Sequence, residues 1–158
     1  MSHPLLPKAA ASILRHLFAS VPPPRSVWLF GSRANGRATV LSDTDLLVFA
    51  DEAFIDSLLS TLSPPEDVDI LVVTDGDTIK YPWKAQEGSL KSWCWSQRHE
   101  SEASYVGRKF YPETDFDEGD REEYQRRLSA ERVAGLEIEE GNGIKYQERA
   151  IRLYPNDA

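Results

Sequence analysis

FGSRANGRATVLSDTDLLVF, the stretch from Phe30 to Phe49, joins a Gly-Ser pair to the end of one apolar run and two aspartates to the start of the next. Successive side chains of a β-strand point to opposite faces of the sheet, so residues two apart share one face. If the second run is a strand, Asp43 and Asp45 lie side by side, roughly 7 Å apart at Cα. Because carboxylates resist burial, their place beside a buried run predicts a functional site.

The chemistry of these residues suits a phosphate that is bound together with a cation. Two neighbouring carboxylates repel each other unless a cation lies between them, and hard oxygen ligands of this kind suit Mg²⁺. Gly31 lets the backbone approach a ligand closely, and Ser32 at a helix start offers its hydroxyl and N–H groups to an anion. Arg33, the next residue, is either a further phosphate contact or a solvated surface residue.

Outward from this stretch, the hydrophobic pattern predicts an α/β domain. Apolar residues at three- and four-residue spacing predict amphipathic helices, and short apolar runs predict buried strands. The expected order is a helix over Lys8–Ala19, a strand over Val27–Phe30, a short helix over Ser32–Gly36, a strand over Leu46–Ala50, a helix over Asp51–Leu62 and a strand over Val68–Val73. This order predicts a short mixed sheet with flanking helices.

Asp69 interrupts the apolar run of the third expected strand, between Val68 and Ile70. A carboxylate inside a buried strand needs a polar or ionic partner. If that strand lies beside the one that carries Asp43 and Asp45, Asp69 becomes the third carboxylate of a site for two metal ions. It would then act as the base, or as a metal-bound helper, that deprotonates an attacking hydroxyl.

The composition limits the partners of this chain. It has 158 residues, a formal net charge of −8 and a pI near 4.9. We therefore expect no broad nucleic-acid-binding surface, because such binding depends on clustered Lys and Arg. The single cysteine, Cys94, excludes an internal disulfide and fits a reducing compartment. With no long apolar run and no signal peptide, we expect a cytoplasmic protein without a membrane segment.

After Thr74 the sequence patterns are weaker. Arg121–Glu140 has high helix propensity and mixed charge, which is typical of a solvated helix. We expect a core over residues 1–76 and a C-terminal extension over residues 77–158. The extension is expected to be helical or partly disordered, and to pack on the core or continue the same domain.

The pattern Gly31-Ser32, ten residues, then Asp43-x-Asp45 resembles the GS-x10-D-x-D motif of the DNA polymerase β-like nucleotidyltransferase superfamily, above all its minimal nucleotidyltransferases. Asp69 is similar to the third acidic residue of that group. The resemblance implies a nucleotidyltransferase core over residues 1–76, built as a short mixed sheet with flanking helices. It also implies two Mg²⁺ ions, held by Asp43, Asp45 and Asp69.

The implied reaction transfers a nucleoside monophosphate from an NTP, which we expect to be ATP, to an acceptor hydroxyl and releases pyrophosphate. The phosphates would contact Gly31, Ser32 and Arg33. Members that resemble this chain are often paired with HEPN-domain proteins, and some are antitoxins that adenylylate a tyrosine of the partner toxin. A HEPN-like partner protein is therefore the acceptor that the resemblance suggests.

Taken singly, these residues have ordinary structural explanations. Gly31-Ser32 is a common turn, Asp43 a cap or turn residue, and Asp45 a charge on an edge strand. Their combination at this spacing favours catalysis, and two alternatives stay open. One is an antitoxin-type binding module that neutralises its partner by covering it, through the aromatic and acidic C-terminal half. The other is a nucleotidyltransferase for a small molecule such as an aminoglycoside, because an acidic protein suits a cationic drug.

Overall fold

A computed structural model describes residues 6–110, 137–138 and 143–155, and these contain two α-helices, one 3₁₀-helix and nine strands. The α-helices are α1 (Lys8–Phe18) and α2 (Glu52–Thr61), and the 3₁₀-helix η1 spans Lys91–Trp93. The strands are β1 (Ser26–Phe30), β2 (Thr44–Phe49), β3 (Val68–Val73), β4 (Thr78–Lys80), β5 (Glu87–Ser89), β6 (Ser96–His99), β7 (Glu102–Phe110), β8 (Glu137–Ile138) and β9 (Gly143–Tyr154).

The strands form one mixed sheet. Their order is β5-β4-β3-β2-β1-β9-β7-β6, and β8 pairs with β9 off this path. β1 runs antiparallel to β2, whereas β2 runs parallel to β3. The α/β class and the mixed sheet expected from the sequence are therefore confirmed. The helix α2 connects the parallel strands β2 and β3, as parallel pairs usually require.

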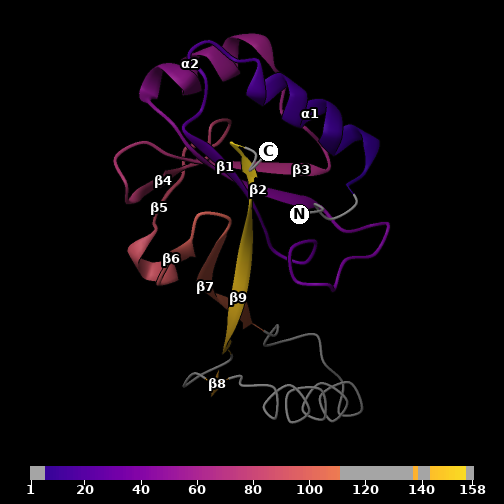
Figure 1. Cartoon of the computed structure of the whole chain (residues 1–158), viewed down its shortest axis with the longest axis vertical. Coiled ribbons are helices and arrows are strands. Elements are labelled where there is room, and N and C mark those ends of the chain that lie inside the picture. The colour runs from indigo at the N-terminus through magenta and orange to yellow at the C-terminus, as the bar shows by residue number, and fades with distance from the viewer. Residues whose placement is uncertain (1–5, 111–136, 139–142, 156–158) are drawn as a thin grey trace. The chain divides into compact units, whose positions relative to one another are not determined.

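Both faces of the three central strands are buried, which explains why their sequences are nearly continuous apolar runs. Leu29 and Leu46 belong to a hydrophobic cluster that also contains the buried residues of α1 and α2. These two helices lie together over the sheet (Figure 1). Trp28, Leu47 and Tyr105 belong to a second cluster. Segments from β4 to β9 supply much of this second cluster and so complete the burial of β1–β3.

The structure changes one expectation near the site. The segment 32–36 was expected to be a short helix, but it forms successive turns. The N–H of Ala34 donates to the carbonyl of Gly31 at 3.1 Å, and the N–H of Asn35 donates to the carbonyl of Ser32 at 3.2 Å. Gly31 and Gly36 both have a φ of +73°. The segment between these two left-handed residues is too short to nucleate a helix.

The helical character expected for the C-terminal extension is not found in the described residues after Val73, which form β4–β9 apart from η1. Burial alternates over residues 147–150 of the last strand, where Glu148 and Ala150 are buried and Gln147 and Arg149 are exposed, as a half-buried strand requires. The helix expected over Arg121–Glu140 falls outside the described residues except at Glu137 and Ile138, which form β8.

The described residues fall into two compact units, residues 6–105 with 149–155, and residues 106–110 with 137–138 and 143–148. The Gly-Ser pair and the three predicted aspartates belong to the first unit. In the second unit, β8 pairs antiparallel with the beginning of β9 through the partners Glu137–Lys145 and Ile138–Ile144. Among the described residues, no helix has both the length and the apolar character that crossing a membrane requires.

Candidate active site

Gly31 follows β1 in a backbone conformation that favours glycine. Its φ is +73°, and a Cβ at this position would overlap Oδ2 of Asp45 and lie 3.1 Å from its Cγ. The preceding residue, Phe30, is paired with Asp45 in the register of β1 and β2, which brings the carboxylate against Gly31. A side chain at residue 31 would therefore displace Asp45, so the position needs glycine for its conformation and for its size.

Hydrogen bonds fix the Gly-Ser turn, by which we mean residues 31–36. The carbonyl of Ser32 accepts from the N–H groups of Asn35, at 3.2 Å, and Arg37, at 3.0 Å. The N–H of Gly31 donates to the hydroxyl of Tyr105 at 2.7 Å. This N–H is therefore used inside the protein, and a phosphate contact of the half-buried Ser32 stays a prediction.

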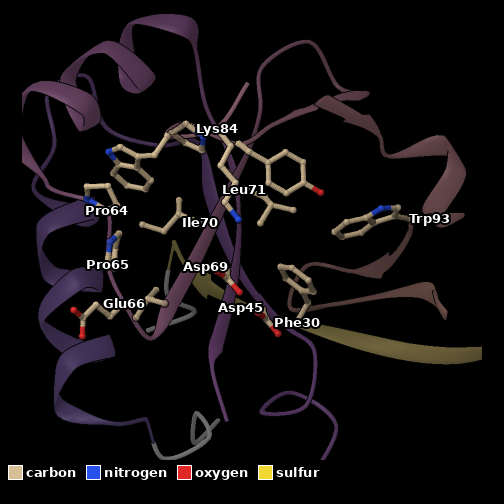
Figure 2. Close-up of a pocket in the computed structure, with 14 residues that line it drawn as sticks. Phe30, Asp45, Pro64, Pro65, Glu66, Asp69, Ile70, Leu71, Lys84 and Trp93 are labelled. Atoms are coloured by element: carbon tan, nitrogen blue, oxygen red, sulfur yellow. The ribbon is translucent and has the colours of Figure 1, made fainter. Parts of the chain in front are cut away.

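Two of the predicted carboxylates come together at the sheet. β2 and β3 are parallel, and their register pairs Asp45 directly with Asp69 (Figure 2). Burial is the largest of the causes that together raise the pKa of Asp45 from 3.8 to about 7. The charge of Asp69, a hydrogen bond with its side chain and the charge of Asp43 act in the same direction, and the charge of Arg33 opposes them. A carboxyl with this pKa titrates near neutral pH, as functional carboxyls often do.

Asp43 is placed differently from the other two. It precedes β2, is exposed and does not line the cavity that contains Asp45 and Asp69. In the part of the chain that the structure describes, no three His, Cys, Asp or Glu side chains are grouped closely enough to hold a metal ion together. The three-carboxylate metal site is therefore not preassembled, and it stays a prediction.

The Asp45–Asp69 pair nevertheless fits a magnesium ion. It offers carboxylate oxygens from two adjacent strands, and burial together with the negative charges of Asp69 and Asp43 raises the pKa of Asp45. Mg²⁺ is commonly held by only one or two carboxylates, with water and substrate phosphates as its other ligands. A cation between these two groups would remove their repulsion, so the donor set is chemically suitable.

Arg33 contacts the loop that leads to Asp43. Its Nη2 donates to the carbonyl of Ser42 at 2.7 Å and to the carbonyl of Thr39 at 3.3 Å. Its Nε is buried and has no hydrogen-bond partner. The guanidinium thus holds the backbone directly before Asp43, while its positive charge lowers the pKa of Asp45. A phosphate contact of Arg33 stays a prediction.

A cavity of about 510 Å³ opens over the carboxylate pair. In Figure 2, Asp45 and Asp69 lie between Pro64 and Pro65 on one side and Phe30 on the other. This volume lies in the range of small-molecule sites, and apolar walls around a few polar groups are typical of them. The lining residues are Phe30, Asp45, Pro64, Pro65, Glu66, Val68, Asp69, Ile70, Leu71, Tyr81, Pro82, Trp83, Lys84 and Trp93.

The sequence did not identify the residues of this cavity that follow β3. Tyr81, Trp83 and Trp93 line it, whereas aromatic residues more commonly serve packing or an interface. Both descriptions hold for Trp93, whose ring also packs on Phe30 with centroids 5.2 Å apart. The only available signal was the aromatic richness of residues 81–95, which does not distinguish a cavity wall from a core.

Comparison with known protein families supports the same region as the functional one. Residues 13–64 match the family model described as Polymerase beta, Nucleotidyltransferase. The match covers about a third of the chain and includes Gly31, Ser32, Arg33, Asp43 and Asp45. No curated protein and no solved structure matches the chain.

Proposed function

We propose that this chain, a nucleotidyltransferase of the polymerase beta-like superfamily, transfers AMP from ATP to an acceptor hydroxyl with the help of Mg²⁺. The observation that carries the proposal is the Asp45–Asp69 pair, set against Gly31 at the base of a cavity. Two carboxylates with a glycine turn beside them suit a triphosphate bound together with Mg²⁺, which commonly takes one or two carboxylates and substrate phosphates as ligands. The resemblance to antitoxins contributes only one element to the proposal, which is the choice of a HEPN-domain partner protein as the acceptor.

Each residue of the site has a role in substrate binding. Ser32 would donate its hydroxyl and N–H to the β- and γ-phosphates, while Asp45 and Asp69 would hold an ion that would neutralise phosphate charge. Asp43, whose charge acts on Asp45, would hold a second ion. Phe30 would supply an aromatic face to the cavity, and stacking of a base on such a face contributes about 1–3 kcal/mol.

The proposed chemistry is a displacement at the α-phosphorus. The acceptor oxygen forms a bond to this phosphorus, and the bond between the phosphorus and the oxygen that bridges the α- and β-phosphates breaks. Pyrophosphate leaves with the bonding electron pair, and the acceptor proton passes to a carboxylate oxygen of Asp69, which is exposed at the cavity. Mg²⁺, when bound, neutralises phosphate charge and acidifies the acceptor hydroxyl.

A label-transfer experiment tests this proposal. Purified protein, Mg²⁺ and ATP labelled at the α-phosphate are incubated with cell lysate fractions and, in parallel, with a HEPN-domain protein. We expect label on one acceptor with the native chain and none with Asp45→Asn, whereas Asp56→Asn, at an exposed position of α2, keeps full transfer. ATP labelled at the γ-phosphate serves as a second control, because that phosphate leaves with pyrophosphate.

Two results would contradict the proposal. Transfer at the native rate by Asp45→Asn would remove the carboxylate pair from the mechanism. Transfer of the γ-label would identify a phosphoryl transfer instead of a nucleotidyl transfer. A tyrosine of the HEPN-domain protein is the acceptor we propose to examine first, and its replacement by phenylalanine should abolish labelling.

A further inference from the structure

We propose that Tyr105, on β7, and the pair Asn35–Arg149, which joins the Gly-Ser turn to β9, are positioning residues for nucleotidyl transfer. They fix the N–H and the carbonyl of Gly31 and thereby set the distance between the Gly-Ser turn and Asp45. The inference rests on the proposed function, because it concerns the placement of the phosphates relative to Asp45. Tyr105 and Arg149 both lie outside the segment that matches the nucleotidyltransferase family.

Tyr105 holds one side of Gly31. Its hydroxyl accepts the N–H of Gly31 at 2.7 Å, which is a short distance for a hydrogen bond from a backbone amide. The tyrosine is 5% exposed, and its ring packs against the rings of Phe30, Trp93 and Trp95. Because the ring is confined on several sides, its hydroxyl presents a fixed acceptor to the turn.

Asn35 and Arg149 hold the other side of Gly31. The Nδ2 of Asn35 donates to the carbonyl of Gly31 at 2.8 Å and to the carbonyl of Arg149 at 3.0 Å. The Oδ1 of Asn35 accepts the N–H of Arg149 at 2.9 Å, and Nε of Arg149 donates to the carbonyl of Ala34 at 2.8 Å. Three of these four hydrogen bonds join the turn to β9, and the fourth, from Asn35 to the carbonyl of Gly31, lies within the turn.

The position of Gly31 matters because Asp45 lies directly against it. A Cβ at residue 31 would overlap Oδ2 of Asp45, so little room is left for Gly31 to move toward this carboxylate. A displacement in the other direction would separate Ser32, the proposed phosphate ligand, from the carboxylate pair. Misplacement by about 1 Å can lower a reaction rate by about a hundredfold, so a turn fixed at both peptide groups favours catalysis.

Tyr105→Phe removes the hydroxyl and retains the ring. Amide hydrogen exchange of the nucleotide-free protein should become at least about tenfold faster at Gly31, with unchanged exchange in β2. In the label-transfer reaction, kcat should fall about tenfold, as the loss of a hydrogen bond of about 1.4 kcal/mol implies. Affinity for the α,β-methylene analogue of ATP with Mg²⁺ should weaken by less than about threefold, because the turn is misaligned but intact.

Tyr154→Phe is the matched control. It removes a hydroxyl from a half-buried tyrosine of β9 whose ring stacks on Phe18, in a different hydrophobic cluster from that of Tyr105. We expect this variant to keep the native kcat and the native exchange at Gly31. A second variant, Asn35→Ala, removes the hydrogen bonds on the other side of Gly31 and should reproduce the loss of kcat.

The readouts separate this inference from the proposed function. Unchanged exchange at Gly31 in Tyr105→Phe, or equal kcat in Tyr105→Phe and Tyr154→Phe, would overturn the positioning role. The positioning role would also be overturned if the decrease in kcat equalled the decrease in the fraction of folded Tyr105→Phe, as measured by thermal unfolding. Absence of transfer by the native chain would instead overturn the proposed function, and with it the predicted effect of the positioning residues on kcat. The hydrogen-exchange result would still show whether Tyr105 holds the N–H of Gly31.

Discussion

Replacement of Asp45 by asparagine should stabilise the metal-free protein while it abolishes nucleotidyl transfer. Asp45 lies beside Asp69, and burial followed by the charge of Asp69 raises the pKa of Asp45 from 3.8 to about 7. At pH 8 the native fold therefore contains an ionised carboxyl in a position that disfavours its charge. An asparagine has no charge and can donate a hydrogen bond to Asp69, so it relieves this cost.

The sign and size of the effect follow from the two pKa values. A group whose pKa is higher in the folded state contributes stability below its unfolded pKa, here 3.8, and that stability is lost as the pH rises to about 7. The difference corresponds to at most about 4 kcal/mol, since one pKa unit equals about 1.36 kcal/mol. Because the carboxyl is only partly buried, solvent screening reduces this, and we expect about 1–2 kcal/mol.

Thermal unfolding with EDTA, at pH 4 and pH 8, measures this difference. Asp45→Asn should unfold roughly 3–6 °C above the native chain at pH 8 and near the same temperature at pH 4. Added Mg²⁺ should raise the Tm of the native chain more than that of the variant. Asp56→Asn, on the exposed side of α2, controls for the removal of one negative charge. A variant that is less stable than the native chain at pH 8, or equally stabilised at both pH values, would refute the argument.

Two further predictions concern backbone groups, one at the Gly-Ser turn and one after β3. Gly31→Ala and Gly36→Ala both place a side chain at a φ of +73°, at a cost of about 1–2 kcal/mol each, but only the alanine at residue 31 meets Asp45. Urea unfolding should show a loss of stability in both variants, whereas label transfer should fall about a hundredfold only in Gly31→Ala. Equal transfer by the two variants would contradict a role for the close approach of residue 31 to Asp45. Asp75, after β3, accepts the N–H groups of Asp77 and Thr78, which hold its pKa at about 2. Asp75→Asn should therefore destabilise the protein at pH 7, and the difference from the native chain should disappear as the pH falls from 3.8 to about 2, as measured by urea unfolding.

Local patterns predicted the centre of the fold. The apolar run Val68–Val73 forms β3 with the expected bounds, and the helix expected over Asp51–Leu62 forms as Glu52–Thr61. These elements are determined by residues close in sequence, because hydrophobic periodicity and the pair Pro64-Pro65 that separates the helix from the strand are local features. The strand spacing also anticipated that Asp69 would lie beside Asp45, since residues that interrupt adjacent apolar strands meet when those strands pair in register.

The remaining part of the site depends on pairing between distant segments, which no local pattern reveals. Tyr105 reaches Gly31 only because β9 lies between β1 and β7, and Asn35 meets Arg149 across more than a hundred residues of sequence. The extension, which was expected to be helical or partly disordered, thus supplies strands that contact the Gly-Ser turn. The family-matched segment 13–64 contains Asp43 and Asp45, whereas Asp69 and the proposed positioning residues Tyr105 and Arg149 lie outside it. A fragment ending shortly after β3 would keep the three aspartates and lose Tyr105 and Arg149, so the full chain is the proper unit for measuring activity.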